Sequence, residues 1–161
     1  IGDALAVATL NKKNISKKDF KKFHPSGSLG AKLKTVEDLM FIKDKIPFIN
    51  ENSSMKEALK IITSKKLGLL IAKNSKGNTT GIITDGQIRR VSQKNKNLHS
   101  LKVKNVMTRD PIQVDGEMLA IKALSIMNSR KITSLCIQSK SNKLKTIGII
   151  HIHNILENNI G

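Results

Sequence analysis

The chain has 161 residues, which is enough for one compact domain or two small ones. Its net charge of +17 is compatible with nucleic-acid binding, but nearly all the cations are scattered lysines. The chain also has only four Phe and no Trp or Tyr on which nucleic-acid bases could stack. Specific nucleic-acid binding is therefore disfavoured, although a positive field of this kind attracts small polyanions. No apolar run approaches the roughly 18 residues of a membrane span, and no signal peptide is recognisable.

The start of the sequence reads as the interior of a helix, from Ile1 to Ala8, with no initiator Met. We therefore expect the chain to be a fragment of a longer protein. Cys136, the only cysteine, lies in an apolar stretch and has no partner for an internal disulfide. It is expected to be a small core residue of a protein from a reducing cytoplasm.

An internal repeat organises the rest of the chain. Residues 36–40 match 103–107, and residues 81–84 match 148–151, both at an offset of 67, while residues 57–59 match 122–124 at an offset of 65. A small loop insertion accounts for the difference. The pattern predicts three segments, namely 1–35, 36–97 and 98–161.

Each repeat reads as strand, helix, strand, strand, helix. The predicted strands, in chain order, are 46–49, 67–72 and 80–83 in the first repeat, and 111–114, 134–137 and 146–150 in the second. Gly/Asn/Lys-rich turns join the last two strands of each repeat, over 74–78 and 139–142. The prediction is an α/β (α+β) fold in which two β-α-β-β-α units pack through their sheets.

The helices between the strands are predicted from apolar spacing. Met55, Ala58, Leu59 and Ile62 fall at i, i+3, i+4 and i+7 in the first repeat. The second repeat is expected to present Met118, Ile121 and Ser125 together with Ala123, Leu124 and Met127. Ser53 or Ser54 is expected to cap the first of these helices, and Asp115 to begin the second.

The repeated phrases are similar to CBS motifs, whose pairs form a Bateman module. Residues 81–90 and 148–156 resemble the first and second CBS motifs of bacterial arabinose-5-phosphate isomerases. The phrases Gly2 to Ala8, Asp19-Phe20 and Phe23 to Gly30 resemble the end of the sugar isomerase (SIS) domain in the same family. The resemblance therefore covers the whole chain, in family order.

The resemblance implies a parent enzyme that interconverts ribulose 5-phosphate and arabinose 5-phosphate, the first step toward the lipopolysaccharide sugar Kdo. It also implies a cytoplasmic tetramer without a cofactor, in which the CBS pair dimerises and senses a nucleotide or nucleotide sugar such as CMP-Kdo. His24, within the HPxGxLG-like motif of residues 24–30, matches a catalytic position. An imidazole suits the proton transfer of aldose–ketose isomerisation, although a loop histidine bonded only to backbone is the alternative. The family's other catalytic groups lie upstream of Ile1, so this chain alone is expected to be inactive.

The first CBS motif supplies ligand candidates where its last strand meets the closing helix. Thr84 fits the family position that meets phosphate or ribose, Asp85 follows it, and Gln87 stands where the family has Asp or Asn. The same Thr84 and Gln87 also read as a helix capping box. Arg89 and Arg90 could each bind a phosphate or carboxylate through two hydrogen bonds, or lie on a solvated helix face.

The second motif supplies the remaining candidates. Thr108, Arg109 and Lys131 are expected at equivalent entries to the cleft. His151, His153 and Asn154 take the positions of Thr84 and its neighbours, and the two histidines are expected to share a face at a strand end. A metal site is disfavoured because no second ligand pair stands at a suitable spacing.

Three functions remain open from the sequence. The first is a regulatory CBS pair that binds an anionic nucleotide ligand and alters an attached isomerase. The second is a CBS pair that serves only as an oligomerisation scaffold, and the third is a basic nucleic-acid-binding module.

Overall fold

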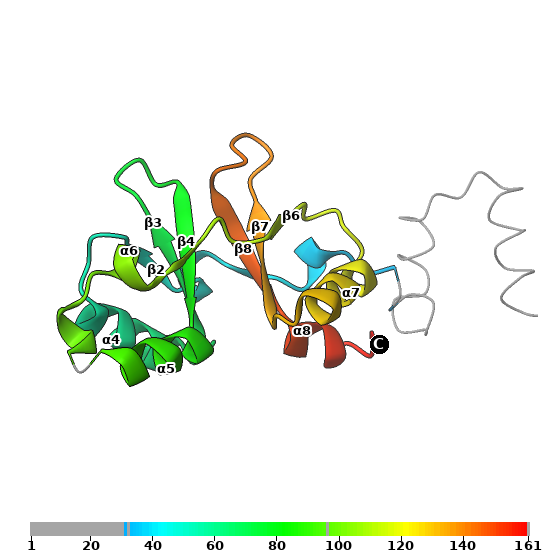
Figure 1. Cartoon of the computed structure of the whole chain (residues 1–161). Coiled ribbons are helices and arrows are strands. Elements are labelled where there is room, and N and C mark those ends of the chain that lie inside the picture. The colour runs from blue at the N-terminus through cyan, green and yellow to red at the C-terminus, as the bar shows by residue number, and fades with distance from the viewer. Residues whose placement is uncertain (1–30, 32, 96, 161) are drawn as a thin grey trace, which may run out of the picture.

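The computed structural model describes residues 31, 33–95 and 97–160, which form two four-stranded sheets with helices against each (Figure 1). The sheet orders are β2-β3-β4-β5 and β1-β8-β7-β6. The predicted helix near the N-terminus and the loop that carries His24 lie outside the described residues. Within the described ranges, every helix is too short or too polar to cross a bilayer.

The two repeats have the same architecture, as predicted. The first comprises β2 (Phe48–Asn50), α4 (Met55–Lys65), β3 (Leu69–Lys73), β4 (Thr79–Thr84) and α5 (Asp85–Lys94). The second comprises β6 (Gln113–Val114), α7 (Ala120–Arg130), β7 (Ser134–Gln138), β8 (Thr146–His151) and α8 (Ile152–Leu156). In each unit the first strand is parallel to the second, and the second is antiparallel to the third.

Short elements connect the two units. They are η1 (Val36–Asp38), β1 (Phe41–Ile42) and η2 (Lys43–Lys45) before the first unit, and η3 (Leu98–Ser100), α6 (Val103–Val106) and β5 (Thr108–Arg109) before the second. Strand β1 pairs with β8, and strand β5 pairs with β4. Each two-residue strand therefore completes the sheet of the other repeat, which ties the units together.

Helix α4 forms as predicted. Ser54 is its N-cap: the Ser54 hydroxyl accepts a hydrogen bond from the Glu57 backbone N–H at 3.3 Å, and the Ser54 N–H donates to the Glu57 carboxylate at 3.1 Å. Met55, Ala58 and Ile62 are buried on the core side of the helix. The reciprocal cap and the apolar spacing together determine where the helix begins and which face it buries.

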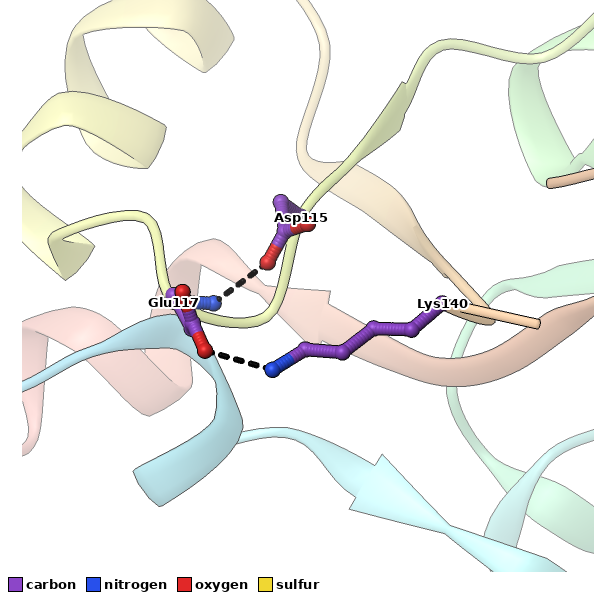
Figure 2. Close-up of polar contacts among 3 residues, drawn as sticks. All are labelled: Asp115, Glu117 and Lys140. Carbon is purple, nitrogen blue, oxygen red and sulfur yellow. Dashed lines mark hydrogen bonds and ion pairs between the residues drawn. The ribbon is translucent and has the colours of Figure 1, made fainter.

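Helix α7 departs from the prediction at its start. Asp115 does not begin it; the Asp115 carboxylate instead accepts a hydrogen bond from the Glu117 N–H at 2.9 Å in a turn, and Glu117 pairs with Lys140 (Figure 2). The helix begins at Ala120, whose N–H donates to the Lys34 carbonyl at 2.9 Å. Ile121 and Ser125 are exposed, so this part of the predicted stripe is wrong, whereas Met118 packs against the core and Ala123, Leu124 and Met127 are buried as predicted. The buried face is formed by Ala120, Ala123, Leu124 and Met127.

The two units share a core between their sheets. Ile46, Leu69, Ile71, Cys136 and Ile149 are buried there in one cluster, with separate clusters beneath the helices of each unit. Cys136 is 1% exposed, and burial raises the pKa of its thiol to about 12. As predicted, the cysteine is a small core residue.

Candidate functional site: a cleft between the two repeats

A cleft of about 600 Å³ lies between the two repeats. One side is formed by the end of β4 and the first turns of α5, and the other by the segments that follow β5 and α7. Its apolar wall includes Leu67, Ile82, Ile112 and Ile132. The cleft therefore has an apolar wall that suits a flat ring and a rim of polar groups.

The N-terminus of α5 opens into this cleft. Thr84, Asp85, Gly86 and Gln87 all line it, and Thr84 in the N-cap position makes no side-chain bond to the helix. The predicted capping box of Thr84 and Gln87 is therefore wrong. The Asp85 N–H already donates to the Gly68 carbonyl at 3.0 Å, so the N–H groups that follow it in the first turn, which have no intrahelical partner, are the donors that remain for an anionic group.

Gln87 fails to cap the helix because its side chain is used elsewhere. Its amide N–H donates to the Val106 carbonyl, and its Oε1 accepts a hydrogen bond from the Thr108 hydroxyl at 2.9 Å. Gln87 thus joins α5 to the strand β5 that crosses between the units. Thr108 also lines the cleft, so this link forms part of the cleft wall.

The opposite rim is formed by the segment that ends α7. Lys131 adopts the left-handed conformation, with φ 54°, and terminates the helix as its C-cap. The chain then turns through Ile132 and Thr133 into β7, and Ser134 lines the cleft. The Ser134 Oγ is buried and has no hydrogen-bond partner among the described residues. An orphaned hydroxyl beside a cleft is a group that a ligand can satisfy.

The second repeat differs at the position equivalent to Thr84. His151 caps α8: its Nδ1 accepts a hydrogen bond from the His153 N–H at 3.3 Å, and the His151 N–H donates to Asn154 Oδ1 at 3.1 Å. His151 is partly buried, and burial, followed by the nearby His153, lowers its pKa below 6.5. The neutral ring therefore accepts at Nδ1 and carries its proton on Nε2.

The structure brings most of the predicted site residues together. Those that line the cleft are Thr84, Asp85, Gln87, Arg90, Thr108, Lys131 and His151. His153 and Asn154 line an adjoining cleft of about 370 Å³. The two imidazoles lie close together, with ring centroids 4.9 Å apart. The prediction that both histidines lie at a strand end is wrong for His153, which belongs to α8.

Two predicted site residues lie elsewhere. Arg89 is exposed on α5 outside both clefts, and Arg109 is exposed in β5, opposite Gly81. Among the residues of the described part, no group of three His, Cys, Asp or Glu side chains could hold a metal ion.

Sequence reasoning missed Gly68, Asp110 and Ser134 as cleft residues. Gly68 and Asp110 have positive φ angles of 63° and 51°, which turn the chain at the cleft rim. A glycine before an apolar strand was the available signal for Gly68. Ser134 gave no signal, because a strand-initiating serine is ordinary until its burial is known.

A model of the CBS domain matches residues 36–94 and 103–161. The chain belongs to the CBS domain family. The arabinose 5-phosphate isomerase KdsD of Yersinia pestis is 38% identical over 157 residues, which are 97% of this chain and 47% of that protein. The predicted likeness to this isomerase group is confirmed, and the chain spans about half the length of the curated relatives it matches.

Two solved CBS structures show the same fold. CBSX2 in complex with AMP has a TM-score of 0.66 and 19% identity, covering 78% of this chain and 96% of its own. The CBS domain pair of MJ0100, in complex with 5-methylthioadenosine and S-adenosyl-L-methionine, has a TM-score of 0.67 and 21% identity, covering 78% and 94%.

Proposed function

We propose that this CBS pair binds a nucleotide or nucleotide sugar in the 600 Å³ cleft and thereby regulates an attached sugar-phosphate isomerase. The observation that carries the proposal is the uncapped N-terminus of α5, which opens into the cleft. A phosphate there receives backbone N–H groups and the favourable end of the helix dipole.

The remaining cleft groups support the same ligand class. Lys131 and Arg90 supply positive charge at the rim, and the buried Ser134 hydroxyl lacks a partner that a ligand would provide. The carboxylates of Asp85 and Asp110 in the same cleft can accept hydrogen bonds from the hydroxyl groups of a ligand. Of the two similar structures, CBSX2 is in complex with AMP, and the CBS domain pair of MJ0100 is in complex with 5-methylthioadenosine and S-adenosyl-L-methionine.

The regulated activity is proposed from the relatives. The KdsD proteins are named arabinose 5-phosphate isomerases, so the longer protein is proposed to interconvert ribulose 5-phosphate and arabinose 5-phosphate. CMP-Kdo, a downstream nucleotide sugar of that pathway, is the leading candidate ligand. His24 is proposed to act in proton transfer, and this chain is expected to show no turnover by itself. Measurable isomerisation by this chain would contradict that assignment.

The chain is also proposed to self-associate through its helices. Ile121 on α7 and Leu156 on α8 are 39% and 49% exposed, although both are large apolar side chains. Covering them in a dimer removes apolar surface from water. Sedimentation at increasing concentration tests this, and a chain that stays monomeric would contradict it.

Calorimetric titration of this chain with CMP-Kdo, CMP, AMP and ATP tests the binding proposal. The variant Lys131→Met is expected to weaken binding at least tenfold, because it removes a cation from the rim. Arg89→Gln is the matched control, since Arg89 is a cation outside the clefts and its loss should leave the affinity unchanged. If the wild type and both variants bound the ligand with equal affinity, the cleft would be excluded as the binding site.

A further inference from the structure

An open groove lies at the end of the molecule where the hairpin turns project, away from α4, α5 and α8 (Figure 1). It has a volume of about 360 Å³ and is lined by residues of β2, of the end of β3 and of the turn that follows β3. No Asp or Glu is among these residues, and none of them lines the cleft between the repeats. The groove is therefore a separate place on the molecule.

The two hairpin turns are rich in cations. Residues 73–78 and 139–145 contain no Asp or Glu, and they include Lys73, Lys76, Lys140, Lys143 and Lys145. Glu117 pairs with Lys140, and in the part of the chain that the structure describes the other four lysines have no carboxylate within ion-pair distance. An anion that approaches the turns therefore meets uncompensated positive charge.

Contacts between the turns bring a cation of the second repeat to the groove. The Thr79 N–H donates to the Leu144 carbonyl at 2.8 Å, and the Thr79 hydroxyl donates to the Thr146 hydroxyl oxygen at 2.8 Å. These bonds hold the two hairpins together. A Cβ built on Gly77, which lines the groove, would lie 4.0 Å from Lys145 Cε. Lys145 therefore lies at the rim of the groove.

Lys73 supplies a second cation, on the wall of the groove. Its Nζ lies 3.3 Å from the centroid of the Phe48 ring, whose face attracts the ammonium and helps to hold it there. Burial, followed by the charge of Lys145, lowers the pKa of Lys73. The two ammonium groups therefore repel one another, and an anion placed beside both would be attracted to each of them.

The asparagine side chains of the groove are available chiefly as donors. Asn74 Oδ1 accepts hydrogen bonds from the backbone N–H groups of Lys76 and Asn78, each at 3.0 Å. Asn50 Oδ1 accepts one from the Asn52 N–H at 2.9 Å. Because the backbone engages both oxygens, the Nδ2 groups are left for a ligand, and an amide Nδ2 only donates. Ammonium and amide donors without a carboxylate suit an oxyanion.

We propose that this groove binds the phosphate group of a small molecule, either inorganic phosphate or a phosphate monoester. Lys73 and Lys145 balance the two negative charges of a phosphate dianion, and the Nδ2 groups of Asn50 and Asn74 donate to its oxygens. The site combines groups of both repeats. It goes beyond the proposed function and does not depend on it, because the groove and the cleft share no lining residue.

Nuclear magnetic resonance of the nitrogen-15-labelled chain tests the proposal by titration with inorganic phosphate and with arabinose 5-phosphate at constant ionic strength. The amide signals of residues 75–77 should shift along a saturable curve. Lys73→Met and Lys145→Met should each raise the apparent dissociation constant at least fivefold. Lys73→Arg keeps the charge and should bind like the wild type, which separates lost charge from lost folding.

Two control variants remove a cation without touching the groove. Lys140→Met is the matched control, because Lys140 belongs to the same turn as Lys145 but its ammonium is held by Glu117. Lys131→Met removes a cation of the cleft. Both should leave the titration curve of residues 75–77 unchanged.

The outcomes are distinct. A tighter curve with arabinose 5-phosphate supports the proposal with a phosphate ester as the ligand, and a curve at least as tight with inorganic phosphate supports it with phosphate itself. Shifts that do not saturate, or that Lys140→Met weakens as much as Lys73→Met does, would overturn the groove as a site and show only diffuse attraction to the basic turns. That result would leave the nucleotide site in the cleft standing.

Discussion

The side chain of Met107 lies directly over Gly81, so closely that a Cβ on Gly81 would come within 2.7 Å of Met107 Cγ. Met40 lies over Gly148 in the same way. Met40 and Met107 are 67 residues apart in the sequence, and so are Gly81 and Gly148. Each methionine precedes the short strand that crosses to the other repeat, and each glycine lies in the strand it meets. The phrase that begins one repeat therefore contacts the phrase near the end of the other repeat, once through Met107 and Gly81 and once through Met40 and Gly148.

The closeness of Met107 to Gly81 predicts a large cost for a single methyl group. Gly81→Ala should destabilise the fold by about 1–3 kcal/mol, because the Thr108 carbonyl, 2.8 Å from the added carbon, is backbone and cannot turn aside. Urea unfolding measures the change. Gly86→Ala is the control: the nearest atom to its Cβ is 3.8 Å away, so alanine in α5 should be neutral or stabilising. A neutral Gly81→Ala would contradict the close crossing.

The cap of α4 gives a second prediction. Ser54→Ala removes the acceptor for the Glu57 N–H and should lower the free energy of unfolding by about 1 kcal/mol. Ser92→Ala is the comparison, since the exposed Ser92 hydroxyl only donates to a carbonyl within α5. Equal midpoints of urea unfolding for the two variants would show that the reciprocal cap contributes nothing.

The burial of Cys136 predicts a thiol that is unreactive in the folded state. Burial raises its pKa to about 12, so at pH 8 almost no thiolate is present and a disulfide reagent should label the native chain slowly. Labelling should accelerate with urea as the chain unfolds. Between the ordinary pKa of 9.0 and about 12, the unfolded chain releases this proton first, so alkaline pH lowers stability through Cys136. Rapid labelling in buffer would contradict the buried position.

The lowered pKa of His151 predicts a loss of stability in mild acid. The ring titrates below 6.5 when folded, so at pH 5–6.5 the unfolded chain binds more protons and is favoured. Stability should therefore fall as the pH drops from 7.5 to 5, and His151→Gln should show a smaller fall. His99→Gln, at an exposed histidine of η3, should behave like the wild type. If the free energy of unfolding depended on pH in the same way in all three proteins, the loss of stability in acid would not come from His151.

Sequence patterns were sufficient for the parts of the fold that local physics determines. The apolar spacing and the Ser54 cap defined α4, and the repeat itself predicted the order of strands and helices. The crossing strands β1 and β5 were not predicted, because two residues carry too little periodicity and their pairing depends on distant partners. The start of α7 was not predicted, because its first N–H, that of Ala120, donates to the carbonyl of Lys34, a partner far away in the sequence.

The candidate site was predicted in part for similar reasons. Motif positions identified Thr84 and His151, and the structure places both in the cleft. The bond from Gln87 to the Val106 carbonyl depends on how the two repeats pack, so the local capping pattern was misleading. Arg89 and Arg90 are adjacent in sequence, and only the helix orientation separates the residue that lines the cleft from the one that does not.

Thermal unfolding of this chain with CMP-Kdo, CMP, AMP, ATP and arabinose 5-phosphate at equal concentrations tests directly whether the CBS pair binds a nucleotide or nucleotide sugar. A ligand present at about 100 times its dissociation constant adds about 2.7 kcal/mol, which is a shift of several degrees for a chain of this size. We expect such a shift with at least one nucleotide or nucleotide sugar. Arg89→Gln should retain it, and Lys131→Met should reduce the added stability to about 1.4 kcal/mol or less, in line with binding at least tenfold weaker. Unchanged midpoints with every compound would contradict it and leave the CBS pair as an oligomerisation scaffold.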